Sequence, residues 1–186
     1  MNYLILVNKE NKLDKDYIPD NLVKITTKTG GNKTIYLNKL VYKKIRKLLK
    51  HMNKLFSTEI VIDSGYRPYT YQNMLLNDLI KEKGNDAYKS IALPGTSEHQ
   101  TGFAVDIGFY KNGLYDEYFK IEEYLDEFKW LNDNAYKYGF IIRYPKDKEN
   151  VTGYIYEPWH LRYVGKISKF IYENNLTLEE YLEMFN

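Results

Sequence analysis

The chain has 186 residues, of which 44% are hydrophobic and 16% aromatic, which is enough for one buried core and too few for two comfortable domains. It contains no cysteine, so disulfides and thiolate metal sites are excluded. Its 27 basic and 25 acidic residues are interspersed, which gives no reason to expect a nucleic-acid partner.

The N-terminal apolar run, Tyr3 to Val7, is shorter than the hydrophobic part of a signal peptide and has no basic segment before it. No other segment approaches the roughly 20 apolar residues of a membrane span. We therefore expect a cytoplasmic protein without a membrane span, with an exported location as the alternative.

The first third of the chain predicts a hairpin followed by a long helix. Residues 25–27 and 35–37 flank a Thr-Gly-Gly-Asn turn at 29–32, as hairpin strands do. The following helix is amphipathic, and His51 lies off its apolar stripe as an ordinary surface residue. The stripe comprises Leu37, Leu40, Val41, Ile45, Leu48, Leu49, Met52 and Leu55.

The middle of the chain alternates strands and helices. A strand at 59–63 ends in a turn at 64–68, and Pro68 is placed to open a helix as its first residue. Residues 89–98 predict a loop, 103–109 a strand, and 117–138 a helix that Gly139 ends. The inner face predicted for the helix after Pro68 comprises Tyr71, Met74, Leu75, Leu79 and Ile80.

The last third predicts strands at 140–143, 154–156 and 160–164, then helices at 166–173 and 177–184. Thr177 and Glu180 have the spacing of a capping box. Together these elements indicate an α+β single domain, 1–186, with a small, mainly antiparallel sheet flanked by helices. We divide it into an N-terminal extension, 1–37, and a catalytic core, 38–186.

The strand at 103–108 carries the first candidate site residue. Phe103, Val105 and Ile107 alternate with Ala104, Asp106 and Gly108, so Asp106 lies on a face almost free of bulky side chains. Gly102 permits the chain to turn and bring His99 over that same face. Taken alone, Asp106 could be a turn carboxylate and His99 an ordinary loop histidine.

A second cluster, Glu157-Pro158-Trp159-His160, follows some fifty residues later. Pro158 disfavours a helix interior, so we expect a bent strand edge. Residues three apart point to opposite sides of a flat strand, so Glu157 and His160 can share a cavity only if a bend or bulge lies between them. Trp159 either walls that cavity or fills the core.

These clusters contain the parts of a catalytic zinc site at strand ends and adjoining loops. Two imidazoles and one carboxylate supply three ligands, a fourth position stays open for water, and a glutamate is left over as a base. Arg67, at the end of the strand 59–63, offers fixed hydrogen-bond donors to an oxyanion or a peptide carboxylate. An arginine at that place is otherwise a surface ion-pair partner.

The motifs together resemble the VanY type of zinc D,D- and L,D-carboxypeptidases, which trim peptidoglycan stem peptides. The resemblance rests on Ser64-Gly65-Tyr66-Arg67 with Gln72, on the Ser97-x-His99-x-x-Gly102-x-Ala104-x-Asp106 pattern, and on Glu157-Pro158-Trp159-His160. It implies that His99, Asp106 and His160 bind one Zn2+ per chain and that Glu157 is the catalytic base. It also implies that Arg67 stabilises the transition state.

The resemblance further implies that Gln72 and Ser97 contact the substrate, and we place Trp159 with them. The length is most similar to the VanXY subgroup, linked to vancomycin resistance, which acts on D-Ala-D-Ala and on stem peptides that end in it. Open alternatives are an L,D-carboxypeptidase on tetrapeptides, a phage-type endopeptidase, and a non-catalytic cell-wall or protein binding module with a structural zinc. We expect a monomer or a dimer, and a cell-wall-associated or extracellular location if the protein is exported.

Overall fold

An antiparallel sheet forms the centre of the fold, which the computed structural model describes for residues 2–185 apart from the side chains of residues 89 and 90. Its strands follow the spatial order β3 (Glu59–Ser64), β4 (Ala104–Lys111), β7 (Glu157–Tyr163) and β6 (Phe140–Tyr144). The short β5 (Leu114–Tyr115) pairs with β4. The predicted α+β class with a small antiparallel sheet is confirmed.

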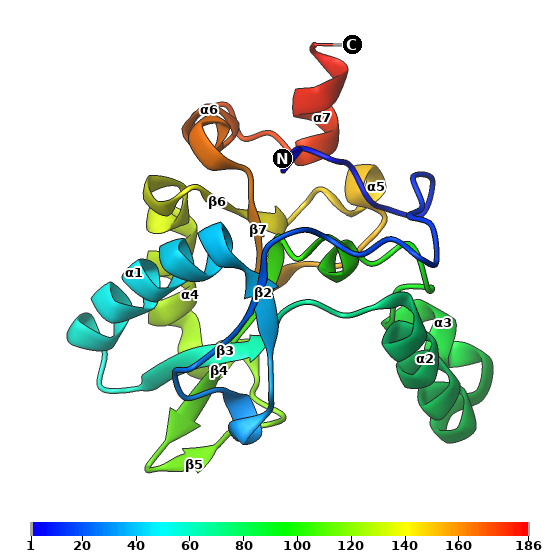
Figure 1. The fold of residues 1–186 in the computed structure, drawn as a ribbon. Helices are drawn as coiled ribbons and strands as arrows, with labels where there is room; N and C mark the ends of the chain where they lie inside the picture. The colour runs from blue at the N-terminus through cyan, green and yellow to red at the C-terminus, as the bar shows by residue number, and fades with distance from the viewer. Residues whose placement is uncertain (1, 186) are drawn as a thin grey trace.

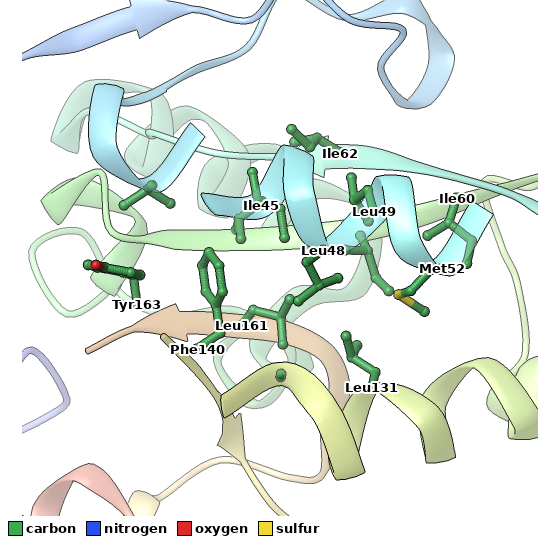
Figure 2. Close-up of a cluster of buried hydrophobic side chains, with 14 of the residues drawn as sticks. Ile45, Leu48, Leu49, Met52, Ile60, Ile62, Leu131, Phe140, Leu161 and Tyr163 are labelled. Carbon is green, nitrogen blue, oxygen red and sulfur yellow. The ribbon is translucent and has the colours of Figure 1, made fainter. Parts of the chain in front are cut away.

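One face of this sheet is buried under α1 (Lys39–Leu55) and α4 (Leu125–Asn134), as Figures 1 and 2 show. The odd-numbered residues of β4 from Val105 to Phe109 point into this core, as their alternation predicts. The opposite face carries Asp106 on β4 and His160 and Arg162 on β7. The face of the sheet that packs against the helices is therefore apolar, and the opposite face carries polar and charged side chains.

The helix α1 begins two residues later than its apolar stripe suggests. Asn38 caps it by accepting a hydrogen bond from the Leu40 amide, so Leu37 belongs to the preceding strand. The predicted stripe is otherwise right in its middle and wrong at its ends, because Leu40 and Leu55 are exposed. His51 is an exposed residue that pairs with the Tyr138 hydroxyl, as expected of a surface histidine.

The N-terminal hairpin forms, but its first strand lies before the predicted range 25–27 and its second is shifted by one residue from 35–37. β1 (Leu22–Lys24) pairs with β2 (Tyr36–Asn38), and a 3₁₀ turn, η1 (Gly30–Asn32), lies between them. Ile25 and Ile35 are joined by one backbone hydrogen bond and are buried in the main core. These two residues, predicted as strand positions, therefore belong to the core beside the hairpin and not to its paired strands.

The inner face predicted for the helix after Pro68 is wrong for two of its five residues, since Leu75, Leu79 and Ile80 are half-buried but Tyr71 and Met74 are not. Pro68 is the N-cap of α2 (Tyr69–Lys83), which buries Gln72 and Leu76 while Tyr71 and Met74 are exposed. Figure 1 shows α2 beside the main body, and the helix buries the polar Gln72 there, which apolar periodicity does not indicate. The predicted loop after it begins only at residue 91, since α3 (Ala87–Ser90) precedes it.

Two further predictions need correction. The helix predicted at 117–138 is three pieces, a 3₁₀ turn η4 (Ile121–Tyr124), α4, and a second 3₁₀ turn η5 (Ala135–Tyr138), which Gly139 ends with φ +91°. Residues 154–156 form no strand, and a short helix, α5 (Glu149–Thr152), precedes them. Local apolar spacing does not separate α-helix from 3₁₀ turns or from buried loop.

The C-terminal helices agree with their prediction. The 3₁₀ turn η6 (Gly165–Ile167) leads into α6 (Ser168–Glu173), and α7 (Leu178–Glu183) starts with a capping box between Thr177 and Glu180. α7 lies beside the N-terminal segment (Figure 1). Among the described residues, no helix has the length and apolar character needed to cross a membrane.

Substituting Leu48 by alanine is expected to lower the free energy of unfolding by about 2–5 kcal/mol, because Leu48 is fully buried between α1 and the sheet (Figure 2) and its loss leaves a cavity. Denaturant titration measures the change. Leu40→Ala on the same helix is the control, since Leu40 is 36% exposed, and it should cost less than about 1 kcal/mol. Equal losses in both variants would contradict the core assignment.

Candidate metal centre and active site

The three predicted ligands come together from three elements on the polar face of the sheet. His99 lies in a 3₁₀ turn, η3 (Glu98–Thr101), while Asp106 on β4 is directly opposite His160 on β7 in the antiparallel register. Gly102 ends η3 with φ +71°, a conformation that favours glycine and returns the chain to β4. One ligand atom from each of the three residues lies within 4.8 Å of the others.

The protonation of His99 follows from its surroundings. Its Nδ1 lies 2.7 Å from the Gly65 carbonyl oxygen, which can only accept, so Nδ1 carries the proton. The Nε2 atom is buried without a hydrogen-bond partner and lies 3.1 Å from Asp106 Oδ2 without hydrogen-bond alignment. Burial and the nearby Arg67 charge lower the pKa of His99 to about 4. His99 therefore presents a bare Nε2 lone pair to Asp106.

His160 is held between two carboxylates. Its Nε2 lies 3.1 Å from Glu98 Oε1, and its Nδ1 lies 2.8 Å from Asp106 Oδ1. Burial lowers the pKa of His160, but Asp106 and Glu98 together outweigh it and raise the pKa to about 9. If Nε2 donates to Glu98 and the ring is neutral, the Nδ1 lone pair faces a carboxylate oxygen. In that neutral form Nδ1 can bind a metal, whereas a second proton on Nδ1 makes the ring cationic.

The donor set fits a catalytic zinc ion. Two imidazole nitrogens and one carboxylate oxygen are zinc ligands, and three protein ligands are the usual number when the fourth position serves water or substrate. The buried His99 Nε2, which has no hydrogen-bond partner, is the atom a metal would complete. Each histidine also has its other nitrogen next to an oxygen acceptor, which is the common arrangement around zinc.

The predicted irregularity between Glu157 and His160 is confirmed. Along β6 the register advances two residues, from Ile142 to Tyr144, while along β7 it covers four, from Leu161 back to Glu157. This bulge brings Glu157 Oε2 to 4.0 Å from His160 Nδ1, and both side chains line one cavity. Burial raises the pKa of Glu157 to about 7, so this carboxyl group can both accept and return a proton near neutral pH.

Arg67 enters the same cavity from the turn after β3. Its Nη2 lies 3.8 Å from Asp106 Oδ2, and its Nη1 donates to Gln72 Oε1 at 3.1 Å. Gln72 is 1% exposed and donates through Nε2 to the Ala92 carbonyl oxygen at 2.7 Å. The Nε of Arg67 is buried without a partner. Gln72 thus fixes the guanidinium, and Arg67 retains a free donor.

The cavity has a volume of about 320 Å³ and includes every predicted site residue in its lining. Ser97 is 5% exposed, lines the cavity and ends the loop 91–97, two residues before His99. Trp159 lines the cavity and also packs edge-to-face on Phe119 at the core, so both interpretations of this residue hold together. Arg67 and Asp106 also border a second hollow of about 670 Å³, formed with Tyr36, Tyr66 and other residues.

Sequence reasoning missed two residues that hold His160. Glu98 contacts its Nε2, and the ring of Tyr144 stacks on the imidazole with centroids 4.9 Å apart. Glu98 stands next to His99 in the sequence, but nothing in its spacing indicates that it serves the other histidine. Burial raises the pKa of the Glu98 carboxyl, but the Arg162 and Arg143 charges outweigh it and hold that pKa well below its usual range.

Comparison with known proteins is consistent with this geometry. Residues 34–166 match the family model described as VanY, D-alanyl-D-alanine carboxypeptidase. The chain is 38% identical to VanXYC of Enterococcus gallinarum, which is named a bifunctional D-Ala-D-Ala dipeptidase and carboxypeptidase. That match covers 97% of this chain and 94% of VanXYC. Two other curated relatives are longer, and the chain spans 67% and 57% of their lengths.

Solved structures share the fold over nearly the whole chain. The LdcB LD-carboxypeptidase is 43% identical with a TM-score of 0.85, covering 98% of this chain and 86% of LdcB. A mutant of the vancomycin resistance D,D-pentapeptidase VanY from a VanB-type cassette, solved in complex with Zn(II), is 31% identical with a TM-score of 0.78. That match covers 97% of this chain and 98% of the other.

Proposed function

Because this chain belongs to the VanY family of D-alanyl-D-alanine carboxypeptidases, we propose that it is a zinc-dependent peptidase that removes the C-terminal D-alanine from peptidoglycan precursor peptides. One observation carries the proposal. The ligand atoms of His99, Asp106 and His160 cluster within 4.8 Å in a cavity that also receives Glu157 and Arg67. D-Ala-D-Ala itself is a second substrate under this proposal.

The roles follow from the positions of the side chains. His99 Nε2, Asp106 and His160 Nδ1 hold the metal, which when bound supplies Lewis acidity to the attacking water and to the scissile carbonyl. Glu157 takes a proton from that water and returns it to the amine of the departing D-alanine, as its pKa of about 7 permits. Each hydrolysis consumes one water molecule, whose hydroxide joins the acyl carbon and whose proton goes to the amine of the departing D-alanine.

Arg67 completes the site as an electrostatic stabiliser. Arg67 lines the cavity and its Nε has no hydrogen-bond partner among the described residues, so the guanidinium has donor capacity left for the developing oxyanion or the substrate carboxylate. Gln72 keeps that group in place from the opposite side. Ser97 and Trp159 border the space where the terminal D-alanine lies under this proposal.

Arg67→Lys is expected to lower kcat/KM for D-alanine release by about 10²–10³-fold, because lysine lacks the planar set of donors that Gln72 orients. Zinc content should not change, since Arg67 is not a ligand. Arg46→Lys is the matched control, because Arg46 lies on α1 against Tyr42 and away from the cavity. Wild-type kinetics in Arg67→Lys would exclude the assigned role.

A second candidate function is an L,D-carboxypeptidase on tetrapeptides, which the 43% identity to LdcB favours. One assay separates the two. Zinc-loaded protein is incubated with D-Ala-D-Ala, with a pentapeptide precursor ending in D-Ala-D-Ala, and with the corresponding tetrapeptide, and released D-alanine is measured. Release from the pentapeptide is the expected result. Release from the tetrapeptide alone would support the L,D activity, and release from none by a zinc-bound protein would exclude a carboxypeptidase.

A further inference from the structure

A buried group of four charged side chains lies behind the metal centre and outside its cavity. It consists of Glu98, Arg143, Arg162 and Glu179, hereafter the charged network, and no side chain in it is more than 8% exposed. Burying charges is costly even when they are paired, so a network of this kind is weak evidence for stability alone. Two glutamates and two arginines make it electrically neutral as a unit.

Glu98 is the member that reaches the metal centre. Its Oε2 accepts from Arg143 Nε and from Arg162 Nη1, each at 2.8 Å. These two bonds leave Oε1 directed at His160 Nε2, 3.1 Å away. The carboxylate is therefore fixed by two arginines at one oxygen and offers the other to a single imidazole.

The two arginines are in turn anchored by distant parts of the chain. Arg143 makes a forked contact to Glu179 on α7, at 2.9 and 2.6 Å. Arg162 Nη2 donates to the carbonyl oxygens of Tyr3 and Ile5, at 3.2 and 2.6 Å. The N-terminal segment and α7 lie side by side in Figure 1. Both ends of the described chain thus contribute to holding Glu98.

Glu98 is the side chain that contacts His160 Nε2, while Asp106 faces Nδ1 on the other side of the ring. The ring stacks on Tyr144, which restrains its plane but permits rotation within that plane or exchange of the proton between nitrogens. His99, in contrast, is fixed by the Gly65 carbonyl oxygen. In both histidines, a hydrogen bond from the nitrogen that faces away from the metal orients the nitrogen that faces it. For His99 the acceptor is a backbone carbonyl, and for His160 it is the ionised Glu98 side chain.

Resting on the function proposed above, we propose that Glu98 is a positioning residue of the metal centre. It accepts the proton of His160 Nε2, so that Nδ1 is unprotonated and faces the metal. Its negative charge also offsets Arg143 and Arg162, which hold it. Arg143, Arg162 and Glu179 hold Glu98 and touch neither the metal ligands nor the substrate cavity. Glu98 therefore acts on metal affinity through His160.

The test compares Glu98→Gln with Glu179→Gln. Both variants remove one negative charge from the charged network, but only Glu98 contacts His160. We expect Glu98→Gln to weaken Zn2+ binding by about 10–100-fold in chelator competition, and to change the visible spectrum of the Co2+-substituted protein. Glu179→Gln should change metal affinity and the cobalt spectrum far less, because Arg162 still holds Glu98 at Oε2, even if this variant unfolds at a lower temperature.

Wild-type affinity and spectrum in Glu98→Gln, or equal weakening in both variants, would overturn the proposal. Because the glutamine variant leaves two buried arginines short of a counter-charge, its folding is checked by circular dichroism. If it does not fold, nitrogen-15 NMR of the histidine side chains in the zinc-loaded wild-type protein decides. A slowly exchanging proton on His160 Nε2 supports the proposal, and its absence, or rapid exchange, refutes it.

These readouts are independent of peptidase activity. A protein that binds zinc with the expected dependence on Glu98 but cleaves no peptide would contradict the proposed function and leave the role of Glu98 intact. If the wild-type protein and Glu98→Gln cleave peptides equally well at limiting zinc, the proposed function stands and the role of Glu98 is contradicted.

Discussion

Glu157→Gln is expected to lower kcat for D-alanine release by about 10²- to 10⁴-fold while the protein retains its zinc. Glutamine has nearly the same shape but cannot take a proton from the attacking water or return one to the leaving amine. Glu157 Oε2 lies 4.0 Å from His160 Nδ1, and Glu157 is not part of the three-residue ligand cluster. Its substitution should therefore leave zinc binding intact. Stopped assays of D-alanine release and metal analysis on the same sample measure both quantities.

Glu149→Gln is the matched control for this substitution. Glu149 is an exposed glutamate at the start of α5, eight positions earlier in the chain, and the same change of charge there should leave kcat unaltered. Loss of zinc from Glu157→Gln would make Glu157 a ligand and not a base. Unaltered turnover would remove it from the mechanism.

Asp106→Ala is expected to abolish stoichiometric zinc binding and to reduce D-alanine release to background. Asp106 is the carboxylate between the two histidines, 2.8 Å from His160 Nδ1 and 3.1 Å from His99 Nε2. Without it, two neutral imidazoles must hold the cation alone, and a catalytic zinc site normally has three protein ligands. Metal content after dialysis against a weak chelator, together with the peptide assay, measures the effect.

The fold should survive this substitution, because Asp106 lies on the polar face of β4 while Val105 and Ile107 fill the core. Asp78→Ala is the control, since Asp78 is an exposed residue of α2 that pairs with Lys81 on the surface. A chelator added to the wild-type protein should reproduce the Asp106→Ala result, and added zinc should restore only the wild-type activity. Full zinc occupancy in Asp106→Ala would show that the metal lies elsewhere.

The strand that carries Asp106 shows where sequence patterns are reliable. Alternation along β4 reports which side chains share a face, because a strand puts neighbours on opposite sides whatever packs against it. The same kind of reasoning predicted the bulge before His160, since Glu157 and His160 could not otherwise share a cavity. Both inferences depend only on geometry within one short segment.

The helix α2 shows where such patterns fail. Its apolar residues suggested an inner face, but the fully buried side chains are Leu76, which was not in that face, and Gln72, which connects Arg67 to the Ala92 carbonyl oxygen. A helix beside the main body is oriented by the few contacts it makes with the site, and a polar contact outweighed the weak apolar periodicity. The predicted helix at 117–138 failed for a related reason, since tertiary packing breaks it into 3₁₀ and α-helical turns.

The sequence by itself determined the α+β class, the antiparallel sheet and the identity of the candidate ligands and base, because these follow from local alternation, from residue chemistry and from motif spacing. Only the tertiary structure decided which nitrogen of each histidine faces the metal and that Glu98 holds His160. Glu98 meets Arg143 45 positions away and Arg162 64 positions away. Contacts of that kind depend on how separate elements pack, and no periodicity within one element records them.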